Sequence, residues 1–341
     1  MSKSYRVAVV GVTGLVGETM VRVLEERDFP VAQLHALASN RSVGKSVEFK
    51  GERIPVQELS TFDFSQADIA LFSAGSEVSA EYAPKATAAG CIVIDNTSQF
   101  RYEDDVPLVV PEVNAHAIAN YRQRRIIANP NCSTIQMLVA LNPIHRAATI
   151  ERINVATYQS VSGAGREAVE ELAAQTASLL NGRPIGKPRA LAKQIAFNCV
   201  PQIDQFQPNG YTKEEMKMFW ETQKILEDRS IRVNATAVRV AVFYGHSEVV
   251  NIETRRKVSA EEARSLLEKA PGVAVIDERK PGGYPTAVTE AANHDTVYVG
   301  RIREDMSYER GLDLWIVSDN VRKGAATNSV QIAEVLARDY L

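Results

Sequence analysis

The chain has 341 residues, a length that favours two domains over one. Hydrophobic residues make up 45% and charged residues 24%, which is typical of a globular protein with a sizeable core. The net charge of −3 gives no electrostatic reason to expect binding to nucleic acid or to a membrane surface. Three widely spaced cysteines indicate a reducing cytoplasm. Because the sequence contains no CxxC or HExxH motif, no metal site is expected.

The first 131 residues alternate short apolar runs with amphipathic stretches. A helix is predicted over residues 15–27, where apolar residues recur at helical spacing. Strands are predicted over residues 5–11, 34–39, 68–75, 91–97 and 125–130. These strands are apolar throughout, which is typical of a sheet covered on both faces. The pattern predicts an α/β fold with a doubly wound, mostly parallel sheet.

A different pattern begins after residue 131. Longer segments alternate apolar with polar residues, which indicates a mixed or antiparallel sheet with one face less buried. These strands are predicted over residues 151–163, 231–254, 296–305 and 311–320. Helices are predicted over residues 165–180 and 212–228. The last segment, residues 324–341, predicts an amphipathic helix that packs back on the first domain.

A glycine-rich turn follows the first predicted strand. The sequence GVTGLVG places glycines at positions 11, 14 and 17, just before a predicted helix. Such glycines allow a tight turn and bring backbone N–H groups close to a pyrophosphate at the helix N-terminus. An ordinary strand-to-helix turn is the alternative, but the position of the motif favours a dinucleotide site of the Rossmann type. The expected contacts are Gly11, Thr13, Gly14, Leu15 and Val16.

The ends of two further strands bear on the choice of cofactor. No acid follows the second strand to hold a ribose 2′-hydroxyl; Ser39, Arg41 and Ser42 stand there instead. A guanidinium with hydroxyls suits a 2′-phosphate, so this pattern favours NADP over NAD, with a solvated basic loop as the alternative. Ser73 and Gly75 end another strand and are further candidate contacts, although a plain turn would also explain them.

Cys132 lies in the stretch IIANPNCSTIQM, between a predicted strand and a predicted helix. A helix N-terminus stabilises the reactive thiolate through the helix dipole and free N–H groups. We expect the Ser-Thr pair after the cysteine to form the helix entry. The alternative is a buried structural cysteine, which is our interpretation of Cys91 and Cys199. The setting of Cys132 favours a nucleophile.

Three polar residues in the second half are candidate partners of this cysteine. His246 interrupts an apolar strand after Tyr-Gly, where a bulge or a bend would aim its ring into a cleft. Arg239 lies in the same apolar stretch, and a buried guanidinium needs either a structural acid or a carboxylate ligand as its partner. Gln159 precedes a glycine turn and can hydrogen-bond a carbonyl or carboxylate.

Three charged residues are ambiguous by themselves. Arg101 follows the strand that ends in DNTS. Glu214 and Lys217 are three residues apart and so share a helical face. Taken singly, each is most simply a solvated surface charge.

Together these stretches resemble the aspartate-semialdehyde dehydrogenase family. The matching motifs are GVTGLVG, NPNCST, YQSVSGAG, YTKEEMK, VRVAVFYGHSE and DNVRKGAA, in the family's order and over essentially the whole chain. The resemblance implies NADPH-dependent, reversible reduction of L-4-aspartyl phosphate to L-aspartate 4-semialdehyde with release of phosphate, within lysine, threonine and methionine biosynthesis. It also implies a cytoplasmic homodimer. Residues 1–131 with 322–341 would form the NADP-binding domain, and residues 132–321 an α+β catalytic and dimerisation domain.

The resemblance further implies roles for individual residues. Cys132 would attack the acyl phosphate to give a thioester, with His246 as general acid and base and Gln159 orienting the thioester. The residues that would bind the substrate and its phosphate are Arg101, Asn131, Glu214, Lys217 and Arg239. Of these, Arg239 would bind the α-carboxylate and Glu214 would bind the α-ammonium. The nicotinamide end of the cofactor would lie near Ser162, Gly163 and Asn320.

Other functions remain open at this point. The stretch FYG before His246 is bulkier than expected beside an active site and resembles a non-catalytic paralogue group, which lacks the cysteine motif and the arginine that this chain keeps. N-acetyl-γ-glutamyl-phosphate reductase shares the chemistry, but its acylated substrate lacks the free ammonium for which Glu214 argues. A phosphorylating dehydrogenase of a sugar aldehyde is a weaker alternative.

Overall fold

The computed structural model describes residues 3–341, which form two compact units. The first unit is the chain up to Pro130 together with Ala325–Leu341, and the second is Asn131–Gly324. Among the described residues, no helix has both the length and the apolar character needed to cross a bilayer.

The first unit is built on a seven-stranded sheet in the order β3-β4-β2-β1-β5-β6-β7. All neighbouring strands are parallel except β3, which pairs antiparallel with β4. The strands are β1 (Tyr5–Val10), β2 (Val31–Ala38), β3 (Ser46–Phe49), β4 (Glu52–Glu58), β5 (Ile69–Phe72), β6 (Ile92–Asp95) and β7 (Ile126–Ala128). The helices are α1 (Leu15–Glu26), α2 (Ser76–Ala88), α3 (Pro111–Asn114) and α8 (Thr327–Asp339). The doubly wound, mostly parallel sheet predicted from the sequence is confirmed.

The apolar strands of this sheet are buried because helices cover it. Val7 and Val9 of β1 are fully buried in one core with residues of α1 and of the C-terminal helix. From α8, Val330, Ile332 and Leu336 enter that core. The last segment of the chain is therefore part of the first unit.

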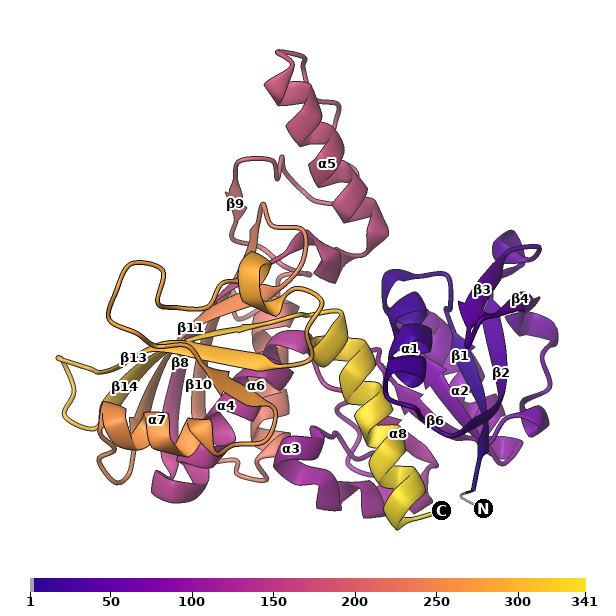
Figure 1. Ribbon diagram of the computed structural model, residues 1–341, viewed down its shortest axis with the longest axis horizontal. Helices are drawn as coiled ribbons and strands as arrows, with labels where there is room; N and C mark the ends of the chain where they lie inside the picture. The colour runs from indigo at the N-terminus through magenta and orange to yellow at the C-terminus, as the bar shows by residue number, and fades with distance from the viewer. Residues whose placement is uncertain (1–2) are drawn as a thin grey trace. The chain divides into compact units, whose positions relative to one another are not determined.

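The second unit is built on a seven-stranded mixed sheet in the order β12-β13-β14-β11-β8-β10-β9 (Figure 1). The pairs β8/β10 and β12/β13 are parallel, and the other pairs are antiparallel. The strands are β8 (Ile150–Gln159), β9 (Cys199–Val200), β10 (Arg232–Val240), β11 (His246–Thr254), β12 (Val273–Val275), β13 (Val297–Glu304) and β14 (Gly311–Ser318). The helices are α4 (Cys132–Ala148), α5 (Arg166–Leu180), α6 (Lys213–Ile225) and α7 (Ala260–Glu268).

Burial alternates along the strands of the second sheet, as its period-two pattern predicted. In β8, Ile153, Val155, Thr157 and Gln159 are buried, whereas Tyr158, which points to the other face, is exposed. The buried face packs against α4, which also contacts α6 and α7. The catalytic candidates on α4, β8 and β11 therefore meet on the helix-covered face.

The prediction of one interrupted strand over residues 231–254 is wrong. The stretch forms two strands on opposite sides of β8: β10 runs parallel to it and β11 antiparallel. The loop between them ends at Gly245, whose φ of +86 favours glycine. His246 is consequently the first residue of β11, after a bend at Gly245 and not at a bulge. Apolar periodicity cannot locate this reversal, because the connecting residues 241–244, Ala-Val-Phe-Tyr, are themselves apolar.

Candidate active site

The glycine-rich turn has a geometry that only glycine allows. Gly11 follows β1 with a φ of +84, and a Cβ added to it would lie 3.0 Å from Ala74 after β5. At Gly17, inside α1, an added Cβ would lie 2.2 Å from the carbonyl oxygen of Gly11. The glycines therefore let the turn after β1 lie close against both α1 and the neighbouring strand end, which is what a backbone cradle for a pyrophosphate requires.

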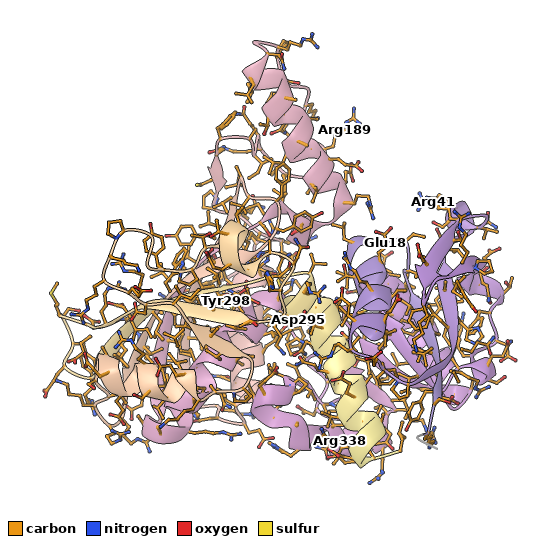
Figure 2. The ribbon with its side chains drawn as sticks, viewed as in Figure 1. Glu18, Arg41, Arg189, Asp295, Tyr298 and Arg338 are labelled. Atoms are coloured by element: carbon orange, nitrogen blue, oxygen red, sulfur yellow. The ribbon has the colours of Figure 1, made fainter. Side chains whose placement is uncertain are left out.

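A cavity of about 620 Å³ opens at this turn, within the first unit. This volume is in the range typical of small-molecule sites. Six predicted contacts line it: Gly11, Thr13, Gly14, Ser39, Arg41 and Ser73. Arg41, labelled in Figure 2, is exposed on the surface of the first unit. Sequence reasoning missed Glu58, Leu59, Ser60, Val78 and Tyr82, which also line the cavity but belong to no recognisable motif.

Four other predicted cofactor residues do not line the cavity. Leu15 and Val16 form the first turn of α1. The hydroxyl of Ser42 lies 3.2 Å from that of Thr13 and thereby joins the turn after β2 to the glycine turn. Gly75 is the residue before α2 and has a φ of +101. The first unit thus fits a dinucleotide, with a narrower set of lining residues than predicted.

Cys132 is the first residue of α4, as the sequence predicted. The side chain before it, Asn131, caps the helix: its Oδ1 accepts hydrogen bonds from the N–H groups of Ser133 (3.0 Å) and Thr134 (3.2 Å). The Ser-Thr pair lies in the first turn of α4, at the helix entry as expected, but the residue that caps the helix is Asn131. A Cβ at Gly324 would lie 2.7 Å from the Cβ of Cys132, so a glycine is required there to leave room for the cysteine.

Glu214 is a buried carboxylate that binds three predicted site residues. It accepts hydrogen bonds from Asn131 Nδ2 (2.8 Å) and Gln159 Nε2 (3.1 Å) and pairs with Lys217 Nζ (2.9 Å). Lys217 also pairs with Asp204 at 2.9 Å. Burial alone would raise the pKa of Glu214, but the charge of Lys217 and these hydrogen bonds outweigh it and lower the pKa to about 2. Glu214 is therefore ionised, and neither it nor Lys217 is the solvated surface charge that each resembled singly.

The ionised state of Glu214 determines the orientation of the Gln159 amide. An ionised carboxylate only accepts hydrogen bonds, so the atom of Gln159 facing it is the nitrogen. The same Nε2 donates to Ser133 Oγ at 2.9 Å. Both N–H groups of Gln159 are thereby used within the protein.

The backbone of Ser160 holds the two other central candidates. Its carbonyl oxygen accepts a hydrogen bond from the guanidinium of Arg239 (2.8 Å), and its N–H donates to His246 Nδ1 (3.1 Å). Burial, followed by the charge of Arg239, lowers the pKa of His246 to about 3, so the ring is neutral. Since Nδ1 accepts, the ring proton is on Nε2, which has no hydrogen-bond partner within residues 3–341.

The residues predicted near the nicotinamide surround His246 within the second unit. The Oδ1 of Asn320 accepts hydrogen bonds from the hydroxyls of Ser160 and Ser162 and from Gly245 N–H. At Gly163, a Cβ would lie 2.8 Å from an Arg239 nitrogen and 3.2 Å from His246 Nε2. Gly163 therefore keeps the space before these two side chains open, which is a role that the sequence motif alone did not indicate.

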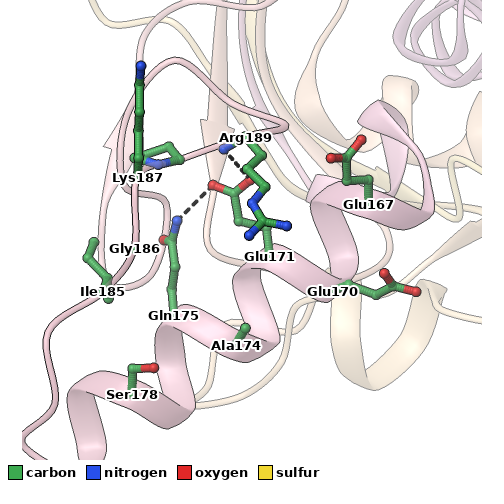
Figure 3. Close-up of a pocket in the computed structure, with 11 residues that line it drawn as sticks. Glu167, Glu170, Glu171, Ala174, Gln175, Ser178, Ile185, Gly186, Lys187 and Arg189 are labelled. Carbon is green, nitrogen blue, oxygen red and sulfur yellow. Dashed lines mark hydrogen bonds between the residues drawn. The ribbon is translucent and has the colours of Figure 1, made fainter.

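Arg101 lies in the first unit, where its guanidinium donates to the carbonyl oxygen of Asn96 at 2.9 Å. Phe243 and Tyr244, the bulky residues before His246, are exposed. A second hollow, of about 530 Å³, lies beside α5 (Figure 3). It contains none of the predicted residues. Its Glu171 accepts hydrogen bonds from backbone N–H groups of the following loop and so has a structural role.

The second unit thus brings together Cys132, Gln159, Glu214, Lys217, Arg239 and His246 in one network of contacts and charges. Sequence reasoning did not single out Ser160 or Gly324, because neither a backbone hydrogen bond nor the need for space beside Cys132 can be read from their motifs, and it assigned Ser133 only to the helix entry.

Comparisons with known proteins agree with this architecture. Residues 6–121 match the family model described as semialdehyde dehydrogenase, NAD binding domain, and residues 141–323 match that described as semialdehyde dehydrogenase, dimerisation domain. The fold and the site therefore define a two-domain oxidoreductase that uses a nicotinamide cofactor.

Individual relatives narrow this class. The aspartate-semialdehyde dehydrogenase of Legionella pneumophila is 61% identical, over 100% of this chain and 98% of that protein. The crystal structure of aspartate semialdehyde dehydrogenase II from Vibrio cholerae, complexed with ASA, has a TM-score of 0.98 and 60% identity over 100% of both chains. That of the Candida albicans enzyme with NADP has a TM-score of 0.75 and 26% identity over 98% of both chains. The chain belongs to the aspartate-semialdehyde dehydrogenase family.

The neutral state of His246 predicts a pH dependence of stability. In the unfolded chain its pKa is near the ordinary 6.5, whereas in the folded state it is about 3, so between these values the unfolded state binds more protons. Stability therefore falls as the pH falls through this window. Between pH 4.5 and 6, the free energy of unfolding of the wild type should fall by up to about 1.4 kcal/mol per pH unit because of His246. We expect His246→Asn to abolish this contribution. Urea unfolding followed by tryptophan fluorescence measures it, because Trp220 and Trp315 both lie in the second unit. Equal slopes in the two proteins would contradict the neutral buried histidine.

Proposed function

We propose that this chain reduces L-4-aspartyl phosphate to L-aspartate 4-semialdehyde, with release of phosphate, using NADPH. The observation that carries the proposal is the cluster in the second unit, where a cysteine begins a helix beside a buried arginine, an ionised glutamate and a neutral histidine. The names of relatives about 60% identical over their whole length support it. The product would supply lysine, threonine and methionine synthesis.

The charges of the cluster suit a free amino acid. Arg239 is buried, and its Nε has no hydrogen-bond partner among the described residues, so the guanidinium retains a donor for an α-carboxylate. Glu214 is ionised and retains acceptor capacity for an α-ammonium. N-acetyl-γ-glutamyl phosphate carries a neutral amide in place of the ammonium and would offer Glu214 no positive charge beyond that of Lys217. This argument favours the aspartyl substrate over the N-acetylated one.

Cys132 is proposed as the nucleophile. Its thiolate, favoured by the helix N-terminus and by the nearby positive charge of Arg239, attacks the acyl carbon, and the bond to the phosphate oxygen breaks with its electron pair leaving on phosphate. The result is a thioester on Cys132. When bound, the nicotinamide supplies the hydride that reduces this thioester. Collapse of the resulting hemithioacetal then returns the thiolate and releases the aldehyde.

His246 is proposed as the proton carrier. In the resting state its Nε2–H is a donor directed into the space that Gly163 leaves open. It can therefore stabilise, by donating a hydrogen bond, the oxygen that becomes negative when the carbonyl is attacked. To act as general acid and base, giving a proton to that oxygen and taking it back in the collapse step, the ring must first gain a second proton, because a neutral imidazole that loses its only proton becomes an imidazolate. The low pKa of the ring makes it a weak base at rest, so we assign the donor role to the first contact with substrate.

Phosphate binding is proposed for Lys217 and Arg101. Lys217 is largely buried and presents a point charge, whereas Arg101 presents a planar fork. Asn131 is also proposed to contact the phosphoryl group, although its amide already caps α4 and binds Glu214. Gln159 is proposed to orient the thioester, which requires one of its two N–H groups to exchange its partner for the carbonyl oxygen.

NADP is the proposed form of the cofactor. Arg41 and Ser39 line the cavity of the first unit, and no acid occupies their positions in the turn after β2. Gly11, Thr13 and Gly14 would hold the pyrophosphate, with Leu15 and Val16 of α1 behind them. The pyrophosphate and ribose end would be completed by Ser42, Ser73 and Gly75. The nicotinamide end would lie near Ser162, Gly163 and Asn320.

The proposal includes a homodimer in the cytoplasm. The second unit matches a domain model named for dimerisation, and one face of its sheet, which carries Tyr158 and Trp315, is less buried than the other. An aromatic pair on a sheet face suits a second copy of the chain. A catalytic thiol must stay reduced, which favours the cytoplasm.

The function is tested by phosphate-dependent reduction of NADP with L-aspartate 4-semialdehyde. We expect absorbance at the wavelength of NADPH to rise only when both phosphate and the aldehyde are present. N-acetyl-glutamate semialdehyde and a sugar aldehyde phosphate serve as competing substrates. A preference for either, with no turnover of aspartate semialdehyde, would replace the proposed function.

The covalent mechanism predicts that Cys132→Ala abolishes turnover. Loss of the nucleophile removes the thioester route, so kcat should fall by a factor on the order of 10⁴ or more. NADPH binding, measured by fluorescence titration, should persist because the cofactor turn lies in the first unit. Cys199→Ala, at an exposed cysteine, is the matched control and should leave kcat unchanged. Turnover that survives in Cys132→Ala would remove the covalent mechanism.

The cofactor assignment predicts the effect of Arg41→Ala. Loss of the guanidinium should weaken NADPH binding by about 10- to 100-fold, in line with a charged hydrogen bond to phosphate, while NADH binding changes little. Direct binding titrations with both cofactors measure this without turnover. An equal loss for the two cofactors would place Arg41 outside a 2′-phosphate site.

A further inference from the structure

Glu248 is a fully buried acid that the proposed chemistry does not use. It lies in β11, two residues after His246, where it pairs with Thr157 of β8 and Ile316 of β14. Its side chain is 0% exposed. Neither carboxyl oxygen makes a hydrogen bond of normal geometry with the described residues, although Ser133 and Gln136 of α4 lie close enough to affect its pKa.

The surroundings of Glu248 favour the neutral acid. Burial raises its pKa well above the ordinary value, and the nearby side chains of Gln136 and Ser133 only partly oppose this. No cation acts on it, in contrast to Glu214, which Lys217 holds ionised. A neutral carboxylic acid has one O–H donor and an acceptor oxygen, so it can transmit a hydrogen bond in one direction.

Other unpaired polar atoms surround the carboxyl group beneath α4. Gln136 contributes both amide atoms and Thr157 its hydroxyl, and none of these has a hydrogen-bond partner within residues 3–341. Thr157 lies directly opposite Glu248 in the sheet. Unpaired buried polar groups are costly, so a cluster of them beside a catalytic helix needs an explanation other than packing.

Ser133 connects this cluster to the site. It follows Cys132 in the chain, and its hydroxyl oxygen accepts the hydrogen bond from Gln159 Nε2 at 2.9 Å. A hydroxyl that accepts from one side still has its own proton to donate. The carboxyl group of Glu248 is the acceptor at hand on the other side.

We propose that Glu248 is a positioning residue that acts through Ser133 to hold Gln159 and the first turn of α4 in place beside Cys132. The hydrogen bonds run in one direction, from the Gln159 amide to Ser133, from Ser133 to the carbonyl oxygen of Glu248, and from its O–H to Gln136. The inference rests on the proposed roles of Cys132 and Gln159 and adds the group that keeps them aligned.

The experiment compares three variants of the full chain. Glu248→Leu removes the acceptor for Ser133 and should lower kcat by about 10- to 100-fold, the usual effect of a small misplacement of a reacting group. The KM for aspartate semialdehyde should change far less than kcat. Glu248→Gln keeps one donor and one acceptor and should retain kcat within about threefold. Val250→Ala, at a buried residue of the same strand face, is the packing control and should lower stability without lowering kcat.

Coupling to Gln159 separates positioning from a general loss of structure. If Glu248 acts through Gln159, Glu248→Leu should lower kcat no further when Gln159 is already alanine. An undiminished effect in that background, or a Glu248→Leu enzyme as fast as wild type, overturns the proposal. If Glu248→Leu fails to fold by circular dichroism, Ser133→Ala replaces it and should show the same loss and the same coupling.

The rate at which iodoacetamide alkylates Cys132, followed by mass spectrometry, gives a readout without substrate. Glu248→Leu should change this rate several-fold, whereas Glu248→Gln and Val250→Ala should not. An unchanged rate in Glu248→Leu contradicts the inference. A wild-type chain that lacks turnover with aspartate semialdehyde instead contradicts the proposed function, and the alkylation rates then still decide on Glu248.

Discussion

The buried charge of Glu214 is the constraint on which the arrangement of the second unit depends. A carboxylate removed from water is tolerated only when cations and hydrogen-bond donors replace the water. Here the donors come from Asn131 before α4, from Gln159 at the end of β8 and from Lys217, which lies on α6 together with Glu214. One charge therefore fixes the helix that carries Cys132, the strand that carries Gln159 and the helix that carries Lys217. The contacts that compensate the buried charge are therefore the same contacts that set the geometry of the site.

A second set of contacts, made by the backbone of Ser160, orients the side chains of His246 and Arg239. Its N–H and carbonyl oxygen hold His246 and Arg239. Backbone atoms are anchored by the sheet, so they position these side chains more rigidly than another side chain would. His246 is thereby left with a buried Nε2 that has no hydrogen-bond partner among the described residues, and Gly163, which has no side chain, lies close against it. A ring held by the backbone on one side and a donor without a partner on the other make a neutral imidazole available as a donor.

The sequence predicts those features that depend on residue type and local order. The apolar strands, the glycine turn and the cysteine at the start of α4 are of this kind, because each follows from short-range spacing. The cap made by Asn131 and the reversal between β10 and β11 depend on which of several competent residues or turns tertiary packing selects. Glu58 and Tyr82 line the cofactor cavity from elements far apart in the chain, which no spacing records. Charged residues such as Glu214 and Lys217 are the hardest to interpret, since burial, invisible in the sequence, decides their role.

Two glutamates of opposite ionisation state flank the Gln159 amide. Glu214 is ionised because Lys217 lies beside it, whereas burial without a neighbouring cation raises the pKa of Glu248 and favours its neutral form. The first receives a hydrogen bond from Gln159 directly, and the second lies beyond Ser133, which receives the other. If Glu248 were ionised as well, it would add a negative charge without a cation beside it near the thiol of Cys132 and would oppose thiolate formation. If both were neutral, the cluster would hold no negative charge for an ammonium group. The difference between two identical side chains therefore comes from a single lysine, which lies beside Glu214 and does not act on Glu248.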